Sequence, residues 1–141
     1  MRQSFYTNKT QREIKKPVTT EVLLQRALKL ADEAMYWCPN TFRLVSYALE
    51  RLQYPLFLKK DTRERFEPLI SRRLDEIVLL FAKNNYLQGI DQLFSLGFIT
   101  SDNVVGLIDA AESAHNVEVT GHLFELRRRY FGYDVMSEFD L

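Results

Sequence analysis

The segment AAESAHNVEVTGHLFEL, residues 110–126, decides the predicted fold class. It lies within two runs in which apolar residues recur at the i, i+3, i+4, i+7 spacing of one helix face. The apolar residues are Val104, Leu107, Ile108 and Ala111 in the first run, and Val119, Leu123, Leu126 and Tyr130 in the second. His115 and Asn116 stand between the runs, so the segment predicts two amphipathic helices joined by a tight turn.

The same spacing recurs upstream and predicts an all-α fold. Four further helices are expected over about 20–38, 42–53, 68–85 and 87–96, with Pro68 in the first turn of the third. The stretch 55–73 is expected to be a connector that can hold a short helix. In the first helix the apolar stripe consists of Leu24, Ala27, Leu28, Ala31, Ala34 and Met35. Five Gly and four Pro are too few for the turns of a many-stranded sandwich or barrel.

Local signals mark several helix ends. Thr19 or Thr20, and later Asn40, are expected N-caps. Gly97 suits the left-handed position past a helix end, with Phe98 and Ile99 closing the cap. Thr100, Ser101 and Asp102 offer an N-cap and an acidic first turn for the helix that follows.

The 141 residues are the size of one domain. Six helices with short connections are expected to pair into three stacked antiparallel hairpins over residues 19–132. Residues 1–18 are polar and basic without helical periodicity and are expected to form a flexible arm. Residues 133–141, YDVMSEFDL, form an acidic tail that also carries apolar side chains.

The second and third hairpins align with a shift of 30 residues. Leu74 then falls on Val104, Ile77 on Leu107, Val78 on Ile108, Leu87 on Val117, and Leu93-Phe94 on Leu123-Phe124. This period is in the range of helical-hairpin solenoids. Burial of Leu93, Leu107, Ala111 and Leu123 between the two hairpins is expected.

Residues 110–126 resemble the helix-turn-helix half of an ankyrin repeat. Two Ala residues precede the turn at His115 and Asn116, Glu118 and Val119 open the second helix, and Leu123 and Phe124 take the paired apolar positions. Residues 81–97, FAKNNYLQGIDQLFSLG, look like a more divergent copy. The resemblance spans about residues 69–131, without the Thr-Pro-Leu-His start or room for β-fingers. It implies a scaffold that presents a binding surface, and it names no partner.

Candidate catalytic and metal-binding residues are few. His115, Glu118 and His122 form an H-x-x-E-x-x-x-H string, which has no zinc-enzyme spacing, and a turn histidine with a surface Glu/His pair is the structural interpretation. Cys38, the single cysteine, is expected to be a buried or half-buried structural thiol. No catalytic residue, cofactor or metal is predicted, so an enzyme is disfavoured. Three glycines inside predicted helices, Gly89, Gly106 and Gly121, are interpreted as points of close helix approach.

Charge is divided along the chain. Residues 1–73 carry 15 Lys and Arg against 8 Asp and Glu, whereas residues 74–141 carry 4 against 11. A partner-binding role is hypothesised for six basic residues, with a solvated face as the alternative: Lys59, Lys60, Arg63, Arg65, Arg72 and Arg73. Arg127, Arg128 and Arg129 are interpreted as a solvated helix end. Phe139 and Leu141 would anchor the acidic tail on this basic half or on another copy, giving self-association by opposite charges.

The predicted function is a non-enzymatic protein-protein interaction module, an inhibitor, adaptor or assembly factor that binds through its helical surface. The alternative is a nucleic-acid-associated protein that uses the basic half. No apolar run is long enough for a membrane span, and the lone cysteine suits a reducing compartment, so no membrane partner and a cytoplasmic location are expected.

Overall fold

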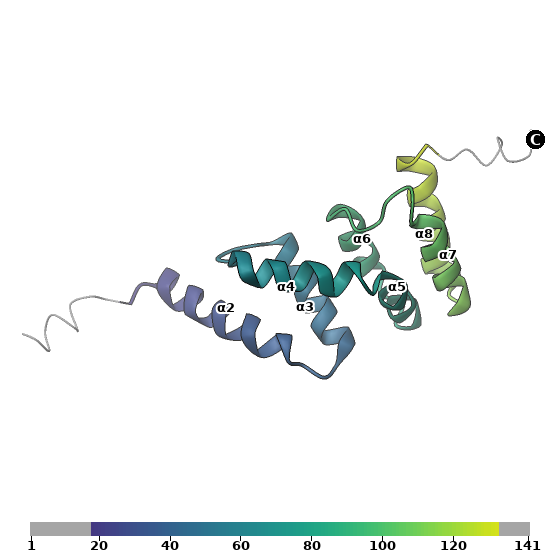
Figure 1. Ribbon diagram of the computed structural model, residues 1–141. Coiled ribbons are helices and arrows are strands. Elements are labelled where there is room, and N and C mark those ends of the chain that lie inside the picture. Colours follow the sequence, from purple (N-terminus) through teal and green to yellow (C-terminus); the bar gives the residue numbers. More distant parts are fainter. Residues whose placement is uncertain (1–17, 133–141) are drawn as a thin grey trace, which may run out of the picture.

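The structure, a computed structural model, describes residues 18–132, and over that range it is helical with no strand (Figure 1). The helices are α2 (Thr20–Tyr36), α3 (Thr41–Gln53), α4 (Lys60–Ser71), α5 (Leu74–Lys83), α6 (Leu87–Ser95), α7 (Val104–Ser113) and α8 (Val117–Tyr130). The all-α prediction is confirmed, but these residues form seven helices where six were expected. None of the seven is both long and apolar enough to cross a bilayer. The predicted tail and all of the predicted arm except Val18 lie outside the described residues.

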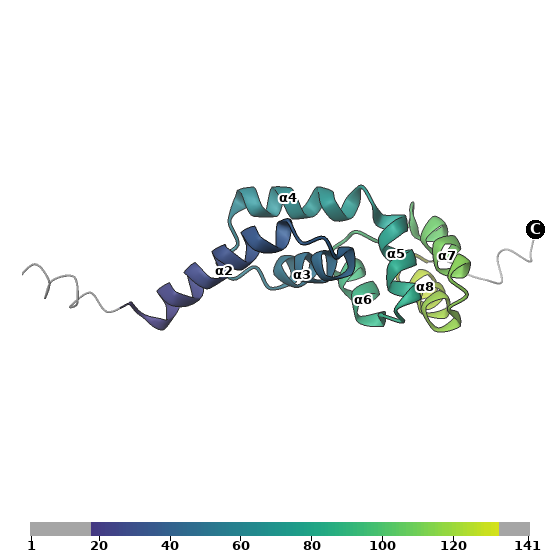
Figure 2. The same ribbon diagram turned by 90° about the horizontal axis from the view of Figure 1, so that it is seen from below.

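Helix α2 begins at the expected cap but is buried differently from the prediction. The Thr19 hydroxyl oxygen accepts a hydrogen bond from the Val22 N–H at 3.2 Å. Of the predicted apolar stripe, Leu24, Ala27 and Ala34 are exposed and the other three residues are half-buried. The N-terminal half of the helix projects away from the body (Figure 2). The stripe is therefore not a core face over its whole length.

Asp32, the only buried residue of α2, anchors the helix to α3. Its carboxylate accepts two hydrogen bonds from the Arg51 guanidinium, at 2.8 and 3.1 Å, and one from the Tyr47 hydroxyl at 2.6 Å. Arg51 also donates to the carbonyl oxygen of Leu56 at 2.8 Å. Burial, together with the bond to the Asp32 carboxylate, raises the pKa of Tyr47 above its ordinary value. Each charged group is thus compensated, as a buried ion pair must be.

Helix α4 fills most of the stretch 55–73, where a connector with a short helix was expected, and shows that the predicted start of the third helix at Pro68 is wrong. Pro68 lies in the third turn of α4, and not in the first turn of a helix that continues through Leu74. The helix buries Phe66 and Ile70 completely. Packing of these two side chains keeps the chain helical on both sides of the proline, although Pro68 cannot donate a hydrogen bond to the preceding turn. The break falls instead at Arg72 and Arg73, before α5.

Two further helix ends were predicted from local signals, and one of these predictions is confirmed. Gly97 has φ +84°, and the Phe98 N–H donates to the Leu93 carbonyl at 2.9 Å, which confirms the predicted glycine cap of α6. Helix α7 begins at Val104, two residues later than an N-cap at Ser101 requires and three later than one at Thr100. Its N-cap is Asn103, whose side chain bonds back to the backbone of residues 98 and 100 and not to the helix. Asp102 accordingly lies outside the first turn.

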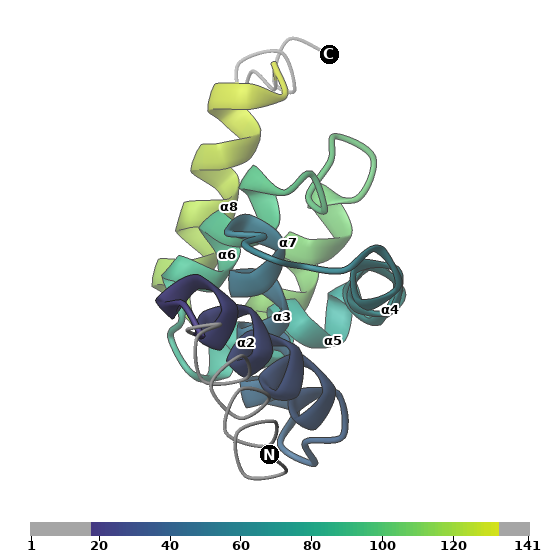
Figure 3. The same ribbon diagram turned by 90° about the vertical axis from the view of Figure 1, so that its left-hand side faces the viewer.

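A continuous core joins α3 to α8. Leu93, Leu107, Ala111 and Leu123 are fully buried in it, as predicted. Helix α5 packs against α7, α6 against α8, and the last two helices against each other. Viewed from the side of α2 (Figure 3), α2 lies in front of α3 while α7 and α8 lie behind. The first and last described helices therefore occupy opposite ends of the molecule.

Candidate functional site

The outer face of α7 and α8 contains an apolar hollow of about 420 Å³. It is lined by residues from the end of α7, the turn and the first eight residues of α8: Glu112, His115, Asn116, Val117, Thr120, Gly121 and Phe124. The side chain of Val117 is 85% exposed and that of Phe124 is 42% exposed. Large apolar groups in a surface depression lose their contact with water only when another molecule covers them.

The turn that shapes this hollow is fixed by its own sequence. His115 follows the end of α7 with φ +57°, a left-handed backbone conformation that reverses the chain. Asn116 then caps α8 by accepting a hydrogen bond from the Val119 N–H at 3.0 Å. The same side chain donates to the Ala82 carbonyl at 2.7 Å and to the Asn85 side chain at 3.1 Å. Asn116 thereby holds the α7–α8 turn against the α5–α6 turn.

The glycines of the hollow and its neighbourhood differ from the prediction. A methyl group at Gly121 or Gly106 would meet no atom of the described chain within 4 Å, so the close-approach interpretation is wrong for both within residues 18–132. At Gly89 the interpretation is confirmed, because an added Cβ would lie 2.5 Å from the Phe81 and Tyr86 rings. Gly121 therefore leaves an open surface between its neighbours where most residues would place a side chain.

The members of the H-x-x-E-x-x-x-H string have separate surroundings. His122 Nε2 lies 2.5 Å from Asp91 Oδ1 on α6, and the Glu118 carboxylate accepts a hydrogen bond from Asn85 at 3.2 Å. His115 lines the hollow. Within residues 18–132, no three His, Cys, Asp or Glu side chains lie together in a metal-binding group. Cys38 is half-buried, with its Sγ 3.8 Å from the Asn40 carbonyl oxygen.

The six predicted basic residues lie along α4 and its ends. Three of them pair with acids within four residues: Lys60 with Glu64 at 3.9 Å, Arg63 with Glu67 at 3.7 Å, and Arg73 with Glu76 at 3.0 Å. Arg65 lies over the Tyr36 ring, 5.6 Å from its centroid. Lys59 precedes α4 and Arg72 follows it. Because a helix rises 1.5 Å per residue, Lys60 and Arg72 are roughly 18 Å apart along α4. The six basic residues therefore form two groups, one in the first turns of α4 and one at its C-terminal end, and not one compact cluster.

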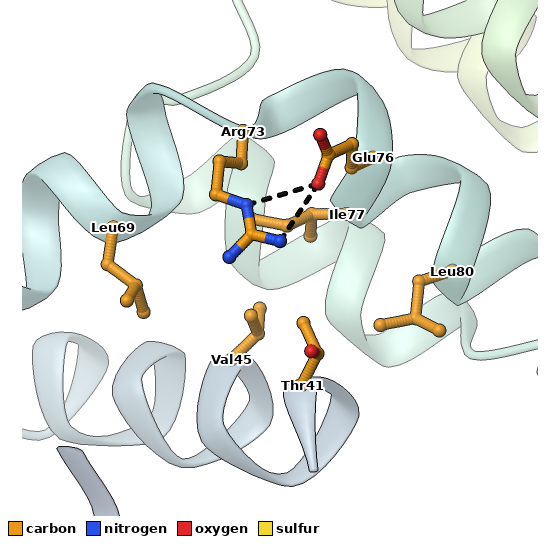
Figure 4. A pocket seen from close by; sticks show the side chains of 7 residues that line it. All are labelled: Thr41, Val45, Leu69, Arg73, Glu76, Ile77 and Leu80. Atoms are coloured by element: carbon orange, nitrogen blue, oxygen red, sulfur yellow. Dashed lines mark hydrogen bonds and ion pairs between the residues drawn. The ribbon is translucent and has the colours of Figure 1, made fainter. Parts of the chain in front are cut away.

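One of these residues, Arg73, borders a second hollow of about 210 Å³ between α3, α4 and α5 (Figure 4). Val45, Leu69, Ile77 and Leu80 supply its apolar walls, together with Thr41. The Arg73 guanidinium and the Glu76 carboxylate are bonded to each other at one side of it. The hollow is half the volume of the one on α8.

The arginines at the end of α8 have a partner on their own helix. Arg128 and Arg129 both bond to the Glu125 carboxylate, at 2.5 and 3.2 Å. The hydrogen bond from Arg128 is the main cause that holds the pKa of Glu125 below its ordinary value, and the same bond raises the pKa of Arg128. Such exposed pairs contribute little to stability. The solvated-helix-end interpretation fits this geometry.

The sequence did not single out the α7–α8 hollow as a site. Val117 and Phe124 occupy positions that look like core positions in a helical pattern, and only the packing shows that they face outward. The proposed anchors Phe139 and Leu141 lie outside the described residues. No protein-family model, curated protein or solved structure matches this chain.

Proposed function

We propose that this chain is a non-enzymatic protein-binding module that uses the outer face of α7 and α8. The observation that carries the proposal is the apolar hollow of about 420 Å³, with Val117 85% exposed at its edge. The surface of this hollow is mainly apolar although four of its lining residues are polar, and such a combination is typical of binding sites.

An ankyrin-like stacking of the last two hairpins is part of the proposal. Helices α5 and α7 both contain ten residues and begin 30 residues apart, and α6 and α8 also begin 30 residues apart. Asn85 and His115, the left-handed residues of the two turns, share this offset. In stacked repeats each hairpin covers the apolar face of its neighbour, and the last one requires a polar cap or a partner. An apolar hollow on the outside of α7 and α8 supports a partner at this position.

The partner that fits best is an amphipathic helix of another protein. Val117, Gly121 and Phe124 follow one another at four- and three-residue spacing along α8, so they form a shallow channel along one helix face. A helix laid in such a groove inserts side chains at i, i+3, i+4 and i+7. Glu112 at the border would favour a basic residue beside these anchors.

The experiment is chemical cross-linking of the full chain in its source cells, followed by titration of the recovered partner against purified variants. Val117→Asp should weaken binding at least about tenfold, because it places a charge where the apolar contact forms. Leu56→Asp, a change at a 52% exposed residue between α3 and α4, is the matched control and should bind normally. Equal binding by both variants would remove the α7–α8 face from consideration.

Salt dependence separates this proposal from the nucleic-acid alternative. A partner held by apolar contacts keeps most of its affinity between 50 and 200 mM salt, whereas binding through several phosphate contacts falls by orders of magnitude. If the partner is nucleic acid, replacement of Lys59 and Arg72 by Ala should weaken binding, whereas Val117→Asp should not. That pattern would favour nucleic acid over a protein partner.

A further inference from the structure

Helix α2 presents an apolar stripe that the rest of the described chain leaves uncovered. The stripe consists of Leu23, Ala27, Leu30, Ala34 and Trp37, all exposed. Leu23 is 55% exposed, Leu30 67% and Trp37 80%. The successive spacings are four, three, four and three residues, which is the a/d repeat of a coiled-coil seam.

The body of the molecule attaches to the other side of α2. Asp32, which binds Arg51 on α3, is the buried residue of this helix. Successive residues turn by 100° around a helix, so Asp32 lies about 160° from both Leu30 and Ala34. The stripe therefore points away from α3, and a second helix can approach it without displacing any packed element. Figures 1 and 2 show no neighbouring helix along the projecting N-terminal half of α2.

We propose that α2 is a dimer interface, on which α2 of a second copy of this chain packs in antiparallel orientation. A two-fold axis between Ala27 and Leu30 places Leu30 of each copy opposite Ala27 of the other. The same axis places Leu23 opposite Ala34, so every layer combines one large and one small side chain. A parallel pair would put Leu on Leu and Ala on Ala, and would alternate wide and narrow layers along one seam.

Charges beside the stripe select the same orientation. Arg26 and Glu33 occupy equivalent positions on one flank of the seam, seven residues apart, and both are exposed. Neither has an ion-pair partner in the part of the chain that the structure describes. In the antiparallel dimer Arg26 of each copy meets Glu33 of the other, which gives two ion pairs by symmetry. In a parallel dimer Arg26 would face Ala31 and gain nothing.

Trp37, the only tryptophan of the chain, provides a direct readout. The antiparallel register puts it opposite Thr20 at each end of the seam, so its emission should shift to shorter wavelength as protein concentration rises. Sedimentation or light scattering on the full chain should give twice 16.6 kDa over the same concentration range. A monomer of 16.6 kDa at every concentration would overturn the proposal. The same result is expected if residues 1–17 or 133–141 of the chain itself cover α2.

A matched pair of variants locates the interface. Leu30→Asp should weaken dimerisation at least about 100-fold while circular dichroism stays unchanged, since Leu30 is 67% exposed and lies outside the core of residues 18–132. Val117→Asp, an equivalent change on the far hairpin, should leave the dimer intact. A dimer that resists Leu30→Asp would refute the interface. Because Val117 belongs to the proposed partner site and Leu30 does not, this test can fail without affecting the proposed function.

Charge reversal tests the orientation. Arg26→Glu and Glu33→Arg should each weaken the dimer by about tenfold, because each converts two attractive contacts into two repulsive ones. The double variant R26E/E33R should recover the original affinity, since the pairs re-form with exchanged signs. Additive loss in the double variant would refute the antiparallel pairing.

Discussion

Replacement of Asp32 by Ala should detach α2 from the body and strongly destabilise the protein. Asp32 and Arg51 are 4% and 5% exposed, and the carboxylate accepts three hydrogen bonds. Without Asp32, the Arg51 guanidinium stays buried with only backbone carbonyls as partners, at 2.8 and 3.4 Å. Loss of one member of a buried pair costs about 3–5 kcal/mol. We therefore expect the free energy of unfolding in urea to fall by this amount.

The double variant Asp32→Leu/Arg51→Met separates the cost of an unpaired charge from the worth of the pair. Apolar residues of similar volume often replace a buried ion pair at little or no cost, so this variant should be close to the original stability. Amide hydrogen exchange should show α2 losing protection in Asp32→Ala and keeping it in the double variant. A loss below about 1 kcal/mol in Asp32→Ala would refute the argument that this carboxylate anchors α2.

Three further outcomes are expected. Burial raises the pKa of Tyr47, so above about pH 10 the unfolded chain loses this proton while the folded chain keeps it. The free energy of unfolding should therefore fall as the pH rises above about 10, and Tyr47→Phe should reduce this fall in urea titrations at several pH values. Gly89→Ala should destabilise the protein by about 1–3 kcal/mol, because the methyl group meets the fully buried Phe81 ring. Gly121→Ala places its methyl group in open space and should stabilise the protein by up to about 1 kcal/mol. Thermal melts should therefore show a lower melting temperature for the first variant and a higher one for the second. Leu123→Asp should abolish the cooperative thermal transition and the helical circular dichroism, and retention of both would contradict a core position for Leu123.

The sequence by itself determined the helical content and most helix ends. Short-range chemistry sets these features: Thr19, Asn40 and Asn116 cap the following helix through their own side-chain oxygens, and Gly97 supplies the left-handed residue after α6. Apolar spacing also found the buried residues Leu93, Leu107 and Leu123, because burial follows the 3.6-residue period of a helix. It was wrong for Tyr130, which was expected on the apolar side of the last helix and is 55% exposed.

Only the tertiary structure decided where Pro68 falls, which face of α2 is buried, and which apolar residues form the candidate sites. Pro68 is acceptable in a first turn by local rules, but the burial of Phe66 and Ile70 extends α4 past it. Two apolar stripes run side by side along α2, and spacing cannot rank them. The choice depends on Asp32 meeting Arg51, 19 residues away in sequence. Partners so distant along the chain leave no periodic signal, because burial is a property of the assembled fold and not of any one segment.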